Sequence, residues 1–210
     1  MKNILTAIAM FIFSVNIYSQ PYYIGKDGVR KQVNTLPISN VYTYDVKTSE
    51  HVSNMLKSFN IDSINYYLFM YVNKHRLNNS LNSLKQDVTL SSVSNLQMNY
   101  QHNVKALTHY QNIKKYETSD KRANEMNLSY EDICENNIFG YVASLKFFVY
   151  SEYVKYNNDN VNELVANYLF NLWKDSDGHN KVMLDPKWEK TYISMSYIDN
   201  YMSIVQIFKK

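Results

Sequence analysis

"TYISMSYIDNYMSIVQIF", residues 191–208, is the stretch that decides the fold class. It consists of two alternating runs rich in aromatic and β-branched residues, separated by the polar pair Asp199-Asn200. Alternation with a period of two is typical of β-strands that bury one face, and a two-residue polar loop between such runs indicates a hairpin. The sequence therefore predicts an antiparallel β-hairpin in this region.

The segments before this hairpin have helical patterns. A short helix is expected at residues 119–126, and apolar residues recur at helical spacing in residues 63–76, 88–104 and 160–174. In the last segment Asn160 can cap the helix and Glu163 occupies the capping-box position, while Ser119 is the expected cap of the short third helix. Residues 141–160 are compatible with strand or helix. Helices followed by a hairpin predict an α+β fold, with helices packed on a small antiparallel sheet.

The first 19 residues resemble a secretory signal peptide. Lys2 precedes a mostly apolar run from Ile4 to Val15, and Ser19 stands before Gln20. This run of about a dozen residues is shorter than the roughly 20 that span a bilayer as a helix, although a retained N-terminal anchor is the alternative. We expect residues 20–60 to form an N-terminal extension and residues 61–210 to form one domain, with no transmembrane anchor after cleavage.

Composition restricts the partners and the source of stability. The 210 residues include one cysteine, Cys134, so no intramolecular disulfide can form and stability must come from packing. Twenty tyrosines and 9 phenylalanines supply large packing surfaces. A net charge of +3 does not favour nucleic acid as the main partner.

Three polar features near the ends of apolar elements could carry chemistry. They are His109 in "LTHYQ", Glu135 in "ICENNIFG" and His179 in "SDGHN". Two imidazoles and one carboxylate suit zinc or a similar divalent cation, although no local metal-binding spacing is present. The structural alternatives are that His179 merely follows a helix end and that Glu135 braces the backbone of its loop.

The order of these motifs resembles the CAP superfamily of cysteine-rich secretory proteins, antigen 5 and plant pathogenesis-related proteins, most closely its disulfide-poor bacterial branch. The resemblance covers about residues 62–208 and rests on the following elements in order: "VNKHRLNNSLNSLKQD" ending in Asp87, Thr108-His109, "CENNI" at 134–138, "WKDSDGHNKVML" at 173–184 and the terminal hairpin.

This resemblance implies an α-β-α sandwich with a cleft, in which His109, Glu135 and His179 hold a divalent metal, most readily zinc. Many relatives have a second glutamate where this chain has Ser176, with Asp175 beside it, so either residue is a candidate fourth ligand. Other departures are Cys134 in place of glycine, one additional asparagine in "CENNI", and a long stretch from Phe139 to Asn160.

The leading functional hypothesis is a secreted bacterial CAP-domain protein located in the periplasm, at the cell surface or outside the cell. It would act by binding, through a metal-holding cleft and through surface recognition of a lipid, a glycan or a protein. The second hypothesis is a metal-dependent hydrolase in which Glu135 is the general base. The third is an interaction protein whose cleft is vestigial.

Cys134 is interpreted as a small buried thiol and not as a nucleophile.

Several neighbouring residues are expected to be structural. His75 and His102 are predicted to lie on the surface, Arg76 to make structural hydrogen bonds, and Asn136 to brace the loop next to Glu135. The apolar stripe that includes Tyr168, Leu169, Leu172 and Trp173 is predicted to lie in the core.

Overall fold

The computed structural model describes residues 23–24, 30–31, 50–51, 54–57, 59–156 and 158–210. The predicted signal peptide, residues 1–19, lies outside these residues, as does most of the predicted extension 20–60. Two short strands from that region, β1 (Tyr23–Ile24) and β2 (Arg30–Lys31), pair with each other antiparallel. Within the described part of the chain, no helix is long and apolar enough to cross a membrane.

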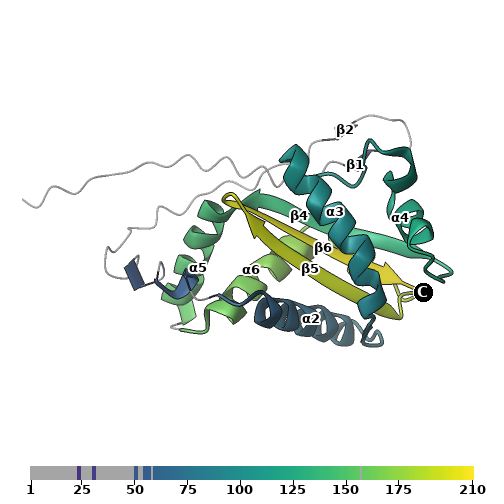
Figure 1. The fold of residues 1–210 in the computed structure, drawn as a ribbon. Coiled ribbons are helices and arrows are strands. Elements are labelled where there is room, and N and C mark those ends of the chain that lie inside the picture. Colours follow the sequence, from purple (N-terminus) through teal and green to yellow (C-terminus); the bar gives the residue numbers. More distant parts are fainter. Residues whose placement is uncertain (1–22, 25–29, 32–49, 52–53, 58, 157) are drawn as a thin grey trace, which may run out of the picture.

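A four-stranded sheet forms the centre of the fold (Figure 1). Its strands are β3 (Lys85–Gln86), β4 (Ile133–Tyr141), β5 (Lys190–Ile198) and β6 (Tyr201–Lys209). Their order is β3-β5-β6-β4, so β4 is an edge strand. Strands β4 and β5 each pair antiparallel with β6, whereas β3 pairs parallel with β5. The small antiparallel sheet of the prediction is therefore formed by β4, β5 and β6, and the short parallel strand β3 makes the sheet mixed.

The predicted hairpin is formed by β5 and β6. Asp199 and Asn200 connect the strands with φ angles of 50° and 65°. Two consecutive positive φ values are the requirement of a type I′ turn, which asparagine and aspartate tolerate better than most residues. The hairpin prediction is confirmed.

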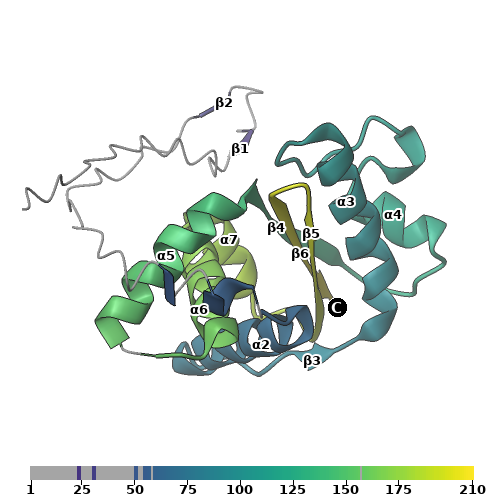
Figure 2. The ribbon, with the colours of Figure 1, turned by 60° about the vertical axis from the view of Figure 1, so that its left-hand side comes forward.

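Helices cover both faces of the sheet, so the predicted α-β-α sandwich is confirmed (Figure 2). One layer contains α2 (Ile61–Asn78), α5 (Val142–Tyr156), α6 (Val161–Lys174) and α7 (Asp177–Met183). The other contains α3 (Ser91–Val104) and α4 (Ser119–Glu125), with the 3-10 turns η1 (Val88–Leu90) and η2 (Lys114–Tyr116) before them. The segment 141–160, which was compatible with strand or helix, is thus mainly the helix α5.

The N-cap of α4 is Thr118 and not the expected Ser119. Thr118 makes no side-chain capping hydrogen bond.

The core consists of two hydrophobic clusters on opposite faces of the sheet, and alternating residues of β6 belong to one or the other. Ile204 and Phe208 pack toward α2 and α6, whereas Val205 and Ile207 pack with residues of η1, α3 and α4. In α6 the predicted stripe is confirmed: Tyr168, Leu169 and Trp173 are buried, and Leu172 is partly buried. Asn160 caps this helix by accepting a hydrogen bond from the Glu163 amide, as predicted.

The contact between α3 and the sheet also has a polar part. Ser94 and Ser194 share a 2.6 Å hydrogen bond, Ser203 donates to Gln101 over 2.6 Å, and His102 lies 2.6 Å from the Ser196 hydroxyl. His102 is therefore partly buried and hydrogen-bonded, and its prediction as a surface residue was wrong. These hydrogen bonds pair polar side chains of α3 with polar side chains of the sheet, which reduces the cost of burying them.

Arg76, at the end of α2, connects the segment after α2 to the end of α7 and to the segment that follows α7. Its guanidinium is fully buried and donates to the backbone oxygens of four residues: Asn82, Met183, Asp185 and Trp188. The prediction of structural hydrogen bonds is confirmed. Its neighbour His75 is partly buried, 2.8 Å from the Asn180 side chain, so the surface prediction was wrong for His75 too.

Candidate functional site

The three predicted site residues meet at the edge strand β4. Glu135 belongs to β4, His109 to the segment between α3 and α4, and His179 to α7 in the opposite helical layer. The Nδ1 atom of His109 lies 3.1 Å from Glu135 Oε1, and the ring centres of His109 and His179 are 6.5 Å apart. The fold therefore brings together residues that are far apart in sequence.

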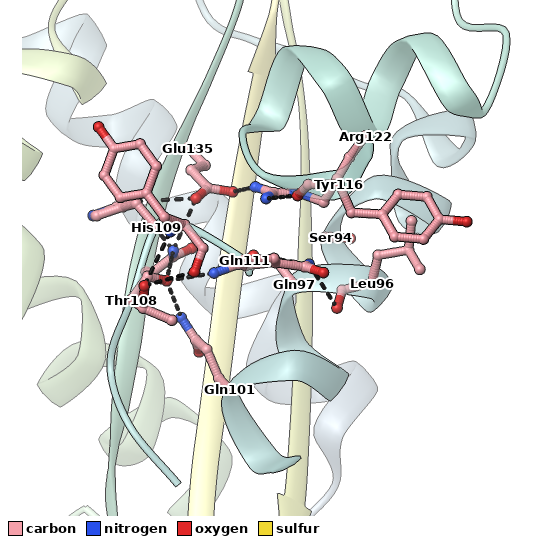
Figure 3. Close-up of polar contacts among 12 residues, drawn as sticks. Ser94, Leu96, Gln97, Gln101, Thr108, His109, Gln111, Tyr116, Arg122 and Glu135 are labelled. Carbon is pink, nitrogen blue, oxygen red and sulfur yellow. Dashed lines mark hydrogen bonds and ion pairs between the residues drawn. The ribbon is translucent and has the colours of Figure 1, made fainter. Parts of the chain in front are cut away.

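Glu135 is a buried carboxylate whose two oxygens are both in use. Arg122 of α4, which is fully buried, donates to Oε2, while Asn137 donates to Oε1 over 3.1 Å (Figure 3). Arg122 also donates to the Tyr116 backbone oxygen over 3.0 Å. Buried charges are tolerated when they are paired and hydrogen-bonded, which is the case for this carboxylate.

The backbone next to His109 is fixed by amide side chains. The carbonyl oxygen of Thr108 accepts hydrogen bonds from Gln97, from Gln101 over 3.1 Å and from Asn137 over 3.1 Å (Figure 3). Gln111 in turn donates to the Gln97 side chain over 3.1 Å. A side chain on such a braced segment is held in place before any ligand arrives. These glutamines were not among the predicted site residues.

The contact with Glu135 sets the tautomer of His109. A carboxylate paired with an arginine can only accept, so Nδ1 of His109 carries the proton and donates to Oε1. Asn137 Nδ2 also lies 3.1 Å from Nδ1, but it donates to Glu135 and to Thr108 instead. In the neutral ring this tautomer leaves the lone pair on Nε2, which is the form in which imidazole binds a metal or accepts a proton.

His179 is held through its backbone and is neutral at pH 7. Its carbonyl oxygen accepts a hydrogen bond from Asn136 over 3.1 Å. Burial, with a further contribution from nearby His109, lowers the pKa of His179 to about 4. Among the residues that the structure describes, none hydrogen-bonds to its ring. Asn136 lies in β4, so it braces α7 and not the loop that the sequence suggested.

The remaining predicted ligands do not join these three. Asp175 is exposed and lies 3.6 Å from Lys174, and Ser176 is the N-cap of α7, where its carbonyl oxygen accepts from the Asn180 amide. Within the described ranges, no three or more His, Cys, Asp or Glu side chains form a group that could hold a metal ion. The ligand set of His109, Glu135 and His179 stays a prediction, and the contacts of Glu135 are those of a supporting carboxylate.

Cys134 does not share the face of Glu135. Neighbouring residues of a strand point to opposite faces, and Cys134 packs against the cluster beneath α2 and α6. Burial is the main cause that raises the pKa of its thiol, so the thiolate is scarce at neutral pH. Cys134 is partly buried, so the interpretation as a buried thiol holds only in part, and its packing and raised pKa agree with the interpretation that it is not a nucleophile.

The low pKa of His179 predicts a pH-dependent stability in metal-free buffer. An unfolded histidine titrates near 6.5 and the folded one near 4, so between these values the unfolded chain binds the additional proton. Stability is therefore expected to fall as the pH drops from about 6.5 to about 4, by about 3 kcal/mol in total from this group. Urea denaturation at several pH values, with EDTA present, would measure it.

The variant His179→Gln serves as the reference for this measurement. It lacks the titrating group but keeps hydrogen-bonding atoms, so its stability should be less pH-dependent than that of the wild type in the same window. All other titrating groups are common to both proteins and cancel in the difference. Parallel curves for the two proteins would show that His179 is not held neutral.

Comparison with known structures places this geometry in a known fold. The chain is similar to an outer surface protein from Borrelia burgdorferi, with a TM-score of 0.56 and 19% identity over 72% of this chain and 96% of that one. It is also similar to an extracellular protein containing an SCP domain from Bacillus anthracis, with a TM-score of 0.50 and 15% identity over 71% of this chain and 41% of that one. The chain has the CAP fold.

This CAP fold was the one implied by the order of the sequence motifs. At 19% and 15% identity, the likeness establishes the fold and leaves the ligand open. No protein-family profile matches the chain, and no curated protein matches it. The fold does not by itself define an activity, so any function has to be argued from the residues of the site.

Proposed function

We propose that this chain is a secreted CAP-domain protein that binds a divalent metal ion through His109 and His179 and acts by binding. The observation that carries the proposal is the convergence of the two imidazoles, with ring centres 6.5 Å apart, beside a carboxylate that holds one of them. Imidazole nitrogens suit zinc, and the His179 ring, with its lowered pKa, requires no loss of a proton before it binds the metal.

Glu135 fits this proposal as a supporting residue. Metal-binding histidines commonly donate their second ring N–H to a carboxylate, which orients the ring and makes it a better ligand. The 3.1 Å contact between His109 Nδ1 and Glu135 Oε1 has this form. A bound zinc ion would supply a Lewis-acidic centre with open positions for a ligand.

The hydrolase alternative is weaker because of Arg122. A general base must be free to take a proton from water, but Glu135 is paired with Arg122 and hydrogen-bonded to Asn137 and His109. Both oxygens of this carboxylate are already occupied by protein donors, so neither is open to a water molecule from which it could take a proton. These contacts support a binding role over catalysis.

Secretion is the second part of the proposal. It is supported by the apolar stretch from Ile4 to Val15, which is typical of a signal peptide, and by the names of the two similar proteins, one an outer surface protein and one extracellular. Periplasm, cell surface and medium are all compatible with this proposal.

Calorimetric zinc titration of the chain lacking residues 1–19 tests the metal site. We expect one-site binding that weakens at least about 100-fold in the double variant His109→Ala/His179→Ala, because both proposed ligands are lost. His51→Ala is the matched control, since His51 is exposed and lies outside the site. A folded wild-type protein that binds no zinc would overturn the metal proposal and favour a vestigial site.

A further inference from the structure

A second cluster of functional side chains lies at the other end of β4. The ring of Tyr201 stacks on Phe139 with centres 5.3 Å apart and lies 4.7 Å from the ring of Tyr141. The Tyr201 hydroxyl donates to that of Tyr141 over 3.1 Å. Lys105, the residue after α3, places its ammonium 5.7 Å from the Tyr201 ring centre. We call Phe139, Tyr141, Tyr201 and Lys105 the aromatic platform.

The aromatic platform is separate from the histidine site. Tyr141 is the last residue of β4 and lies six positions after Glu135, which corresponds to about 20 Å along an extended strand. Tyr141 and Tyr201 are direct cross-strand partners at the hairpin end of the sheet. Binding there would require neither His109 nor His179.

Two features of the aromatic platform indicate a ligand. Phe139 is buried and supports the stack from below, whereas Tyr141 is 51% exposed and presents its ring to solvent. Lys105 has a φ of 50°, in the left-handed conformation that favours glycine at the end of a helix. A lysine there is held at a conformational cost, and strained residues cluster at functional sites.

The ammonium of Lys105 is available for an anion. No carboxylate lies within ion-pair distance of it among the residues that the structure describes. It lies over the face of Tyr201, a contact that positions a cation without neutralising it. An acidic group would gain a full charge partner here.

We propose that the aromatic platform binds a glycan that carries an acidic group. The negative face of an exposed aromatic ring attracts the C–H groups of a sugar ring, and the paired tyrosine hydroxyls offer hydrogen bonds to sugar hydroxyls. Lys105 supplies the partner for a carboxylate. A stable protein interface needs some 20–30 residues a side, whereas this cluster of four side chains matches a few sugar units.

Calorimetric titration of the chain lacking residues 1–19 with two tetrasaccharides tests this proposal. Tetragalacturonate is the acidic probe and chitotetraose the neutral one, and EDTA is present so that no metal site contributes. Tyr141→Ala should weaken the binding of the acidic probe at least about tenfold. Tyr66→Ala is the matched control, because Tyr66 is 56% exposed on α2 and should leave binding unchanged.

Lys105→Gly removes the positive charge of the aromatic platform and leaves the fold intact. Glycine suits the left-handed position, so the melting temperature should stay the same or rise. The affinity for tetragalacturonate should fall about tenfold, while that for any bound chitotetraose should change less than about twofold. Loss of binding in this variant can therefore not be attributed to misfolding.

Two results would overturn the proposal. One is that tetragalacturonate binds equally well to wild type and to Tyr141→Ala. The other is that the folded wild type binds neither tetrasaccharide. In that case, binding through Lys105 to vesicles of phosphatidylglycerol and phosphatidylcholine would assign the aromatic platform to a membrane surface instead. The zinc titration is independent of both.

Discussion

Replacement of Arg76 by alanine is expected to lower the free energy of unfolding by about 4 kcal/mol or more. The Arg76 guanidinium is fully buried and donates to backbone oxygens over distances of 2.6 to 3.3 Å. Each acceptor that loses its donor in the interior costs about 1–3 kcal/mol, and water entering the vacated space recovers only part of this. The lost volume adds a cavity next to buried Met183 and Trp188.

Urea denaturation followed by circular dichroism measures this effect. Lys74→Ala is the control in the same helix, because Lys74 is exposed and its removal should change stability by less than about 0.5 kcal/mol. If Arg76→Ala does not fold, Arg76→Lys gives a measurable intermediate loss, since one ammonium cannot replace a planar fork that reaches separate carbonyl groups. A loss below about 2 kcal/mol for Arg76→Ala would contradict this account.

Local patterns were sufficient for the parts of the fold that depend on local physics. The Asp199-Asn200 turn and the Asn160 cap were predictable because their chemistry lies within a few residues of chain. The stripe of α6 was predictable because its hydrophobic face is wide and continuous. The short strand β3 was missed, because two exposed residues paired to a distant strand leave no alternating pattern.

The face of α3 that contacts the sheet was predictable only in part, and the reason is physical. The apolar spacing of residues 88–104 groups Leu90, Val93, Leu96 or Gln97, Tyr100 and Val104 on one face. Leu90, Val93 and Gln97 are indeed buried, but Val104 is 43% exposed, and the polar residues Ser94 and Gln101 are buried as well. Polar residues on a helix normally indicate the solvent side. Here they are buried because the sheet and the braced segment around Thr108 satisfy their hydrogen bonds.

The site was predicted in part. The order of the motifs was sufficient to nominate His109, Glu135 and His179, but no spacing in the sequence connects Glu135 to Arg122, thirteen positions earlier, because that pairing exists only after α4 packs on β4. The one available signal was an arginine beside Ala123 in a short helix with few apolar residues. Sequence patterns do not identify a buried arginine of this kind, whereas the folded structure does.

Arg122→Met is expected to destabilise the protein by about 3–5 kcal/mol, because it leaves the Glu135 carboxylate buried without its cation. The side chains of this pair are 0% and 5% exposed, so water cannot compensate for the loss and added salt should change the effect little. Lys121→Ala is the contrasting control. It breaks the half-exposed pair with Glu117, and should cost at most about 1 kcal/mol, less at high salt.

A double-mutant cycle decides whether the cost belongs to the unpaired charge. Arg122→Met combined with Glu135→Gln removes both charges, and the double variant should be more stable than Arg122→Met by about 2 kcal/mol or more, despite carrying an additional substitution. Additive losses would show that Arg122 contributes through packing instead.

Zinc titration of the same double variant shows whether Glu135 supports His109 or is itself a metal ligand. If Glu135 only holds His109 in place, zinc binding should weaken about 10- to 100-fold. Loss of all detectable binding would make Glu135 a metal ligand and favour the three-ligand set.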